Sequence, residues 1–414
     1  MQTVTTKPQL AVDGGTPVRR TPFPSWPVFD QRERDALIQV LESGQWSAAD
    51  APQVSAFERE FAAVHQARHG ITAVNGTTTL VIALQALGIG AGDEVIVPPY
   101  TFVATATAVL TANALPIFAD IDPNTYCLDP IAAEAAITPR TKAIIPVHLA
   151  GHPADMDAFL RLRERYGVAI VEDAAHAHGG IWKDRKVGAI GDFGSFSFQA
   201  SKNLTSGEGG ILLTNDDDLA AAARSLHNCG RRPSHPWYEH FILAGNHRLT
   251  EFQAALLRIG LTRLEEQTQR RDANGRYLNK MLGAIPGITP QVRADYCTRH
   301  SQHLYVFRYD STAFGGHSRE EFIAALTAEG IPCSVGYPFP LYRNPLFTEL
   351  RFDTQATGYD PNHAPTAFDC LHLSNTEAAC RETVWFTQNM LLGTESDMAD
   401  VVAAVEKIQA AWRK

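Results

Sequence analysis

The stretch Gly194–Gly210 reads GSFSFQASKNLTSGEGG and is the starting point for interpreting the whole chain. Its first part alternates small residues with Phe196 and Phe198, as in a strand. Its second part is small, polar and rich in glycine, which is typical of a turn. One lysine, Lys202, stands at the bend. Because an isolated lysine is usually a solvated surface residue, its role must be judged from the residues around it.

A second strand-like run precedes this stretch and ends in an acid, Asp173. It belongs to a series of short apolar runs that alternate with helical patterns, at 71–75, 94–98, 115–120, 143–149, 168–173, 194–199 and 209–215. Runs that are apolar on both faces predict buried strands of a largely parallel sheet with helices on each side. Ligands of such sheets bind beyond the carboxyl ends of the strands, where Asp173 lies.

The limits of the helices and domains follow from capping signals and from a change of pattern. Asp30 and Glu33 fit a capping box, and Ser55 with Glu58 fits a second one. The remaining helices are expected at 77–88, at 153–166, from Thr250 to about 281, from Ser318 onward and at 395–413. A length of 414 residues suits two domains. We expect an irregular arm (1–29), a large α/β domain (30–275) and a smaller C-terminal α/β domain (276–414).

A glycine turn between a strand and a helix supplies a further candidate site. Residues 75–80 read NGTTTL, so Gly76 and Thr77 open the expected helix. Free backbone N–H groups and the positive end of a helix dipole suit a phosphate group. The same residues are equally compatible with an ordinary helix cap.

An acid at a strand end and a lysine at a nearby turn are the two groups required by an enzyme that uses pyridoxal 5'-phosphate (PLP). The acid keeps the pyridine nitrogen protonated, and the lysine forms an imine with the cofactor. His176 and His178 raise a metal site as an alternative. A His-Ala-His pair without a third well-spaced ligand is a poor zinc signal, so no metal is expected.

Several motifs in this order resemble the DegT/DnrJ/EryC1/StrS family of PLP-dependent aminotransferases. The matching segments are Asp13–Arg19, Asn75–Thr77, Pro98–Thr105, Glu172–His176, Ser195–Gly210, Gly245–Ala254 and Ala379–Gln388. The resemblance covers nearly the whole chain. It implies the aspartate aminotransferase-like fold, fold type I, with a PLP-binding large domain.

The resemblance also assigns roles to single residues. Lys202 matches the lysine that holds PLP covalently, and Asp173 matches the acid at the pyridine nitrogen. His176 matches the position near the phenolic oxygen. Phe102 matches the aromatic ring that stacks on the cofactor, although the residue type alone is as typical of the core. The phosphate ligands are matched by Gly76, Thr77, Ser197 and, offered by the neighbouring subunit, Asn246.

The implied activity is the transfer of an amino group from an amino acid, glutamine or glutamate, to a keto sugar or keto cyclitol in aminosugar or aminocyclitol biosynthesis. Lysine at position 202 favours transamination, since the sugar 3-dehydratases of this family carry histidine there. Two alternatives stay open. One is an aromatising dehydratase of the aminohydroxybenzoate synthase type, although those enzymes typically carry Gly-Lys where Ser201-Lys202 stands. The other is a non-catalytic regulator that keeps the PLP fold.

Charge and cysteine content bear on partners and location. The net charge is −9 and no basic run is present, which argues against a nucleic-acid partner. The six cysteines form no C-x-x-C pair, so we expect reduced thiols and a cytoplasmic enzyme. The N-terminus lacks the apolar region of a secretory signal, and no apolar stretch is long enough to span a membrane. The role matched by Asn246 implies a homodimer with shared active sites.

Overall fold

The computed structural model describes residues 8–47, 51–360 and 368–413. Its main sheet has the strand order β1-β9-β8-β5-β4-β2-β3. The strands are β1 (His69–Ala73), β2 (Glu94–Val97), β3 (Leu115–Phe118), β4 (Thr141–Ile144), β5 (Ala169–Asp173), β8 (Phe193–Ser197) and β9 (Gly210–Thr214). Neighbours are parallel, except that β9 is antiparallel to both β1 and β8. The expected strands and the largely parallel sheet are therefore confirmed.

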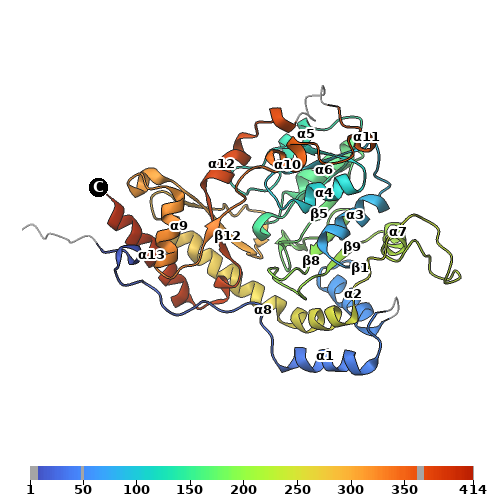
Figure 1. Ribbon diagram of the computed structural model, residues 1–414, viewed down its shortest axis with the longest axis horizontal. Coiled ribbons are helices and arrows are strands. Elements are labelled where there is room, and N and C mark those ends of the chain that lie inside the picture. Colours follow the sequence, from blue (N-terminus) through green and yellow to red (C-terminus); the bar gives the residue numbers. More distant parts are fainter. Residues whose placement is uncertain (1–7, 48–50, 361–367, 414) are drawn as a thin grey trace, which may run out of the picture.

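Helices cover this sheet (Figure 1). They are α2 (Pro52–Val64), α3 (Gly76–Ala86), α4 (Ala104–Thr111), α5 (Pro130–Ala135), α6 (Met156–Tyr166) and α7 (Asp217–His227). Helices α3 to α6 occupy the intervals between β1 and β5, whereas α2 precedes β1 and α7 follows β9. Helix α3 packs against β8 and β9, and α6 packs against β5. This layering buries strands β2, β8 and β9 completely. The carboxyl ends of the parallel strands β2, β5 and β8 lie at one edge of the sheet, where the antiparallel β9 begins.

The helix starts predicted from capping signals are confirmed where both residues of the capping box lie in the same first turn. Asp30 begins α1 (Gln31–Ser43) and Thr250 begins α8 (Glu251–Leu282), each with a capping box. Ser318 does the same for α9 (Arg319–Ala328). The predicted capping box at Ser55 and Glu58 is wrong.

The second helix instead begins at Pro52, with Ala51 as its N-cap. The Glu251 carboxylate accepts hydrogen bonds from the N–H groups of Gln53 (2.9 Å) and Val54 (2.7 Å) and so caps α2 from another helix. Glu58 does not cap this helix. Its carboxylate accepts a hydrogen bond from Thr72 N and forms an ion pair with Arg224.

The C-terminal part contains a four-stranded antiparallel sheet, in the order β10-β12-β14-β13. Its strands are β10 (Ile288–Pro290), β12 (Leu304–Tyr309), β13 (Ser334–Val335) and β14 (Thr383–Thr387). A small sheet of β11 (Cys297–Arg299), β6 (Ile181–Trp182) and β7 (Arg185–Lys186) joins it to the main part. The remaining helices are α10 (Pro345–Thr348), α11 (Thr354–Thr357), α12 (Ser374–Glu382) and α13 (Glu395–Trp412).

Two buried apolar clusters form around these sheets. The first surrounds the main sheet and also includes Tyr342, Phe347 and Phe368, so this part of the chain returns to the large unit. The second lies among the smaller sheet, α8 and α13, and it includes Leu10 of the N-terminal arm. The division into 1–29, 30–275 and 276–414 stays a prediction, and residues 1–7 of the arm lie outside the described residues.

The rest of the arm is held by ion pairs. Arg19, which is nearly inaccessible, contacts Asp397 and Asp400 of α13 at 2.7 and 2.8 Å.

Among the helices that the structure describes, none has the length and apolar character needed to cross a membrane.

Candidate active site

A cavity of about 630 Å³ opens where the main sheet meets the smaller one. It is lined by Gly76, Thr77, Phe102, Asp173, His176, Ser197 and Lys202, which are all the predicted site residues except Asn246. Asn246 is exposed and lies outside this cavity of its own subunit. The segments that carry the lining residues are far apart in sequence, and the sheet brings them together.

The glycine turn forms one end of the cavity. Asn75 caps α3 by accepting from Thr78 N with its side chain and from Thr79 N with its carbonyl, which leaves the first helical N–H groups, those of Gly76 and Thr77, for other partners. A Cβ at Gly76 would lie 2.7 Å from the Cβ of Ser197, so only glycine lets the helix start approach β8 this closely. The arrangement presents backbone N–H groups and a hydroxyl together, as an anion site requires.

Asp173 ends β5 and is nearly inaccessible, with 6% of its surface exposed. Its carboxylate accepts from Thr105 Oγ1 at 2.8 Å and from Ala175 N at 3.2 Å. Burial raises the pKa of Asp173, and these hydrogen bonds oppose the rise only in part. No cation is in contact with this carboxylate among the described residues. A buried acid in this state favours a cationic ligand.

Lys202 lies at the bend after β8, as the sequence predicts. Its backbone N–H donates to Gln199 O at 2.9 Å, and Ser201 donates to the Gln199 side chain, which closes the turn. The indole of Trp26 in the N-terminal arm donates to Ala200 O at 3.0 Å and braces the same turn. Burial lowers the pKa of Lys202 to about 8, and the Asp173 charge counteracts part of this effect. A neutral, nucleophilic amine is therefore accessible near neutral pH.

The two predicted ring residues differ in burial. His176 is 7% exposed, and burial holds its pKa well below the usual value, so the ring is neutral. Phe102 is 59% exposed although it lines the cavity, so it is not a core residue. An aromatic face left open in a cavity is suited to stacking on a planar ligand.

Other lining residues were missed by sequence reasoning. Thr105 and Trp385 lie in segments that match the family but had no role assigned, and Tyr337 and His303 lie in none of those segments. Tyr337, Trp385 and His303 come from the C-terminal part. The sequence predicts substrate-facing residues on two loops, 231–244 and 333–345, without placing them. Tyr337 of the second loop lines the cavity, whereas no residue of the first does.

His178, unlike His176, is placed for packing and not toward the cavity. His178 lies against Phe61, Phe196 and Phe198 and is almost fully buried. Within residues 8–47, 51–360 and 368–413, no group of three or more His, Cys, Asp or Glu side chains is placed to hold a metal ion.

The groups in the cavity fit PLP. Asp173 suits the pyridine nitrogen, Lys202 suits the aldehyde carbon, and the close approach of Gly76 to Ser197 suits the phosphate. The open face of Phe102 suits the ring. A cofactor that needs an acid, an amine and an anion site at once matches this set better than a metal ion does.

Comparisons with known proteins agree with this geometry. The DegT/DnrJ/EryC1/StrS aminotransferase family matches residues 27–406. The L-glutamine:2-deoxy-scyllo-inosose aminotransferase of Micromonospora echinospora is 41% identical over 98% of this chain and 99% of its own length. The 3-amino-5-hydroxybenzoate synthase of Amycolatopsis mediterranei (strain S699) is 39% identical over 93% of this chain and 98% of its own.

A solved structure is similarly close. The crystal structure of 3-amino-5-hydroxybenzoic acid synthase superposes with a TM-score of 0.85 at 38% identity, covering 95% of this chain and 99% of that one. The predicted family, fold and cofactor are thereby confirmed. The chain belongs to the DegT/DnrJ/EryC1/StrS aminotransferase family and is a PLP-dependent aminotransferase of the aspartate aminotransferase-like fold.

Proposed function

We propose that this enzyme transfers the amino group of L-glutamine to the ketone of a cyclitol, of the 2-deoxy-scyllo-inosose type, in aminocyclitol antibiotic biosynthesis. The observation that carries the proposal is full-length similarity to an enzyme named for that reaction, with 98% of this chain covered. The cavity adds support, because Lys202, Asp173 and the Gly76 turn occupy one site.

When bound, PLP supplies an electron sink and carries the amino group between donor and acceptor. The protein would hold it at several points. Gly76, Thr77 and Ser197 would bind the phosphate, Phe102 would cover one face of the ring, and His176 would donate to the phenolic oxygen. The Asp173 carboxylate would favour a proton on the ring nitrogen, because burial disfavours its uncompensated charge, as the raised pKa of Asp173 indicates, and a cationic ring beside it would offset that cost.

Lys202 would have two tasks. Its amine would hold the cofactor covalently and, once released, would carry a proton to and from the α-carbon of the amino acid. A base works best when its pKa lies near the working pH. Burial brings the pKa of Lys202 to about 8, which suits this role.

The active enzyme is proposed to be a homodimer with shared sites. Asn246 is exposed just before α8, and among the described residues its side chain has a single hydrogen bond, a long one of 3.4 Å accepted from Arg248 N. The preceding loop carries exposed apolar residues, with Trp237 73% and Leu243 98% accessible, which suits a surface covered by a second copy. Asn246 would then complete the phosphate site of the partner.

Complementation tests this arrangement. Lys202→Ala and Asn246→Asp, each inactive alone, should regain part of the activity after subunit exchange, because one site of each mixed dimer carries neither change. No recovery despite proven exchange would place Asn246 outside the partner's site.

The location of the enzyme is proposed to be the cytoplasm, since all six cysteines are free thiols.

The activity itself is tested by incubating the PLP-loaded enzyme with L-glutamine and 2-deoxy-scyllo-inosose. Mass spectrometry should detect the amino cyclitol. The alternative, an aromatising dehydratase, draws on the similarity to 3-amino-5-hydroxybenzoate synthase. Formation of an aminohydroxybenzoate from a non-aromatic ring precursor, with no turnover of keto cyclitols, would favour that alternative and overturn the proposal.

A further inference from the structure

The rings of two histidines lie against each other, inclined, in the wall of the cavity. The rings of His176 and His303 lie 4.3 Å apart at an angle of 36°, and both residues line the cavity. His176 follows β5 in the large unit, whereas His303 immediately precedes β12 of the C-terminal sheet. Each ring uses Nδ1 in a protein hydrogen bond, and neither Nε2 has a protein partner among the described residues.

The His176 ring is held in one tautomer. Its Nδ1 accepts a hydrogen bond from Ala150 N at 3.3 Å, so the proton of the neutral ring is on Nε2. His176 therefore presents an N–H donor to the cavity, as its proposed contact with the cofactor requires.

The His303 ring is held in the opposite tautomer. Asn203 donates its amide nitrogen to Ser301 O at 2.7 Å, which leaves the amide oxygen to face His303 Nδ1 at 3.2 Å. An amide oxygen only accepts, so Nδ1 of His303 carries the proton and Nε2 carries a lone pair. The two rings thus offer one donor and one acceptor side by side.

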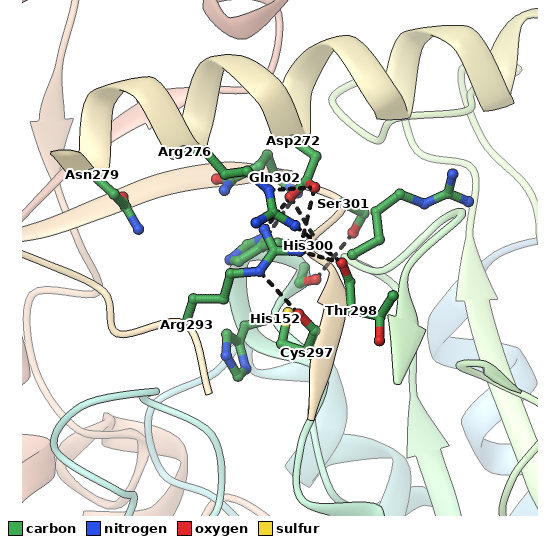
Figure 2. Close-up of polar contacts among 12 residues, drawn as sticks. His152, Asp272, Arg276, Asn279, Arg293, Cys297, Thr298, His300, Ser301 and Gln302 are labelled. Atoms are coloured by element: carbon green, nitrogen blue, oxygen red, sulfur yellow. Dashed lines mark hydrogen bonds and ion pairs between the residues drawn. The ribbon is translucent and has the colours of Figure 1, made fainter. Parts of the chain in front are cut away.

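The segment before His303 is rigidly anchored (Figure 2). Asp272 of α8 accepts from Arg276, from Arg293 and from the N–H group of His300. His300 Nδ1 in turn accepts from Gln302 N at 2.9 Å.

Ser301 continues this anchoring toward the cavity. Its hydroxyl donates to His176 O at 2.9 Å, and it packs so closely on Gly151 that position 151 has no room for a residue larger than glycine. These contacts fix the segment before His303, so the Nε2 acceptor of His303 is pre-organised for one partner.

We propose that Nε2 of His303 accepts a hydrogen bond from a ring hydroxyl of the keto substrate and thereby selects polyhydroxylated ring ketones. The inference rests on the proposed function and adds a specificity-determining residue to it. Burial keeps the pKa of His303 well below its usual value, so the ring stays an uncharged acceptor. A site built to bond a hydroxyl discriminates against analogues that lack it, because the buried acceptor is then left without a partner.

The test separates the two half-reactions of His303→Phe, which keeps an aromatic ring but removes the Nε2 acceptor together with the Nδ1 donor to Asn203. Loss of one hydrogen bond should lower kcat/KM for the keto cyclitol about tenfold. Single-turnover reaction with L-glutamine should stay within about twofold of wild type, because that substrate does not use the bond. Discrimination between the keto cyclitol and its deoxy analogues should shrink, and His303→Gln, which keeps a polar amide near Nε2, should restore part of it.

The matched control is His317→Phe, which changes a histidine stacked on Trp412 far from the cavity. It should leave both half-reactions unchanged. Equal losses in both half-reactions of His303→Phe, or undiminished discrimination, would overturn the proposal. Absence of turnover with every ring ketone in the wild-type enzyme would instead reject the proposed function, and the role of His303 with it. Thermal melting of each variant shows whether the fold is retained.

Discussion

Glu172 and Asp173 are neighbours on β5, and the protein treats them in opposite ways. Glu172 accepts from the N–H groups of Gly188, Ile190 and Gly191 at 2.7 to 2.8 Å and contacts His148 Nε2 at 3.0 Å. Despite complete burial, these partners lower its pKa. Asp173 has fewer partners, and burial raises its pKa.

The difference follows from the alternation of a strand. Successive side chains point to opposite faces, so one acid meets the protein interior and the other meets the cavity. The interior acid has its hydrogen-bonding capacity used by the chain itself, whereas the cavity acid keeps capacity for a ligand. A complete set of partners therefore marks a structural acid, and an incomplete set marks a functional one.

The largest expected effect lies on the cavity side. Lys202→Ala should lower turnover by at least about 10⁴-fold, since it removes both the group that holds the cofactor and the proton carrier. The unfolding midpoint should change little, because no hydrogen bond or ion pair of the Lys202 side chain holds the turn among the described residues. The turn is closed by Gln199 and Ser201. Steady-state assays with circular dichroism check both, and Lys202→Arg is the control that keeps the charge. Wild-type turnover in Lys202→Ala would refute the assignment.

On the interior side, Glu172→Gln should destabilise the fold. The amide would turn N–H groups toward the N–H groups of the chain and would leave buried donors unsatisfied. Breaking a buried charged network of this kind costs about 3–5 kcal/mol. Urea unfolding of the protein without cofactor measures the loss. A variant as stable as wild type would remove the contrast between the two acids.

Asp173→Asn should show the opposite pattern. It keeps the shape but removes the charge that holds the pyridine proton, so kcat should fall about 10²- to 10³-fold. Stability without cofactor should be unchanged or slightly higher, because a costly buried charge has been removed. Rates and urea midpoints measured on the same preparations give the comparison. Full activity would mean that the acid only ends a strand.

The smallest effect concerns buried neutral histidines. Burial lowers the pKa of His65 from 6.5 to about 4 in the folded protein. The unfolded chain therefore binds more protons between these values, so the stability present above pH 6.5 is lost as the pH falls toward 4. One such group accounts for about 2 kcal/mol at pH 5.

His65→Phe removes this titration and should flatten the decline in unfolding free energy between pH 6.5 and 5. Urea titrations at several pH values measure the slope. An unchanged slope in the variant would show that His65 does not contribute to acid sensitivity.

The sequence correctly predicted a helix N-cap where the capping residue and its hydrogen-bond partner lie within a few residues of each other. The caps at Asp30, Thr250 and Ser318 were predicted because each box spans a single turn. Ser55 failed because Pro52 starts α2 and Glu251 supplies its cap from nearly 200 positions away. No window of sequence around residue 55 contains that information.

The same division applies to the active site. The sequence by itself determined the strands, the glycine turn, Asp173 and Lys202, since each depends on periodicity or on a motif within one strand and its turn. Only the tertiary structure decided that His303, Tyr337 and Trp385 line the cavity, because the packing of the C-terminal sheet against the main sheet places them there. It alone decided the opposite tautomers of His176 and His303, because Ala150 and Asn203, which set them, are brought in by folding.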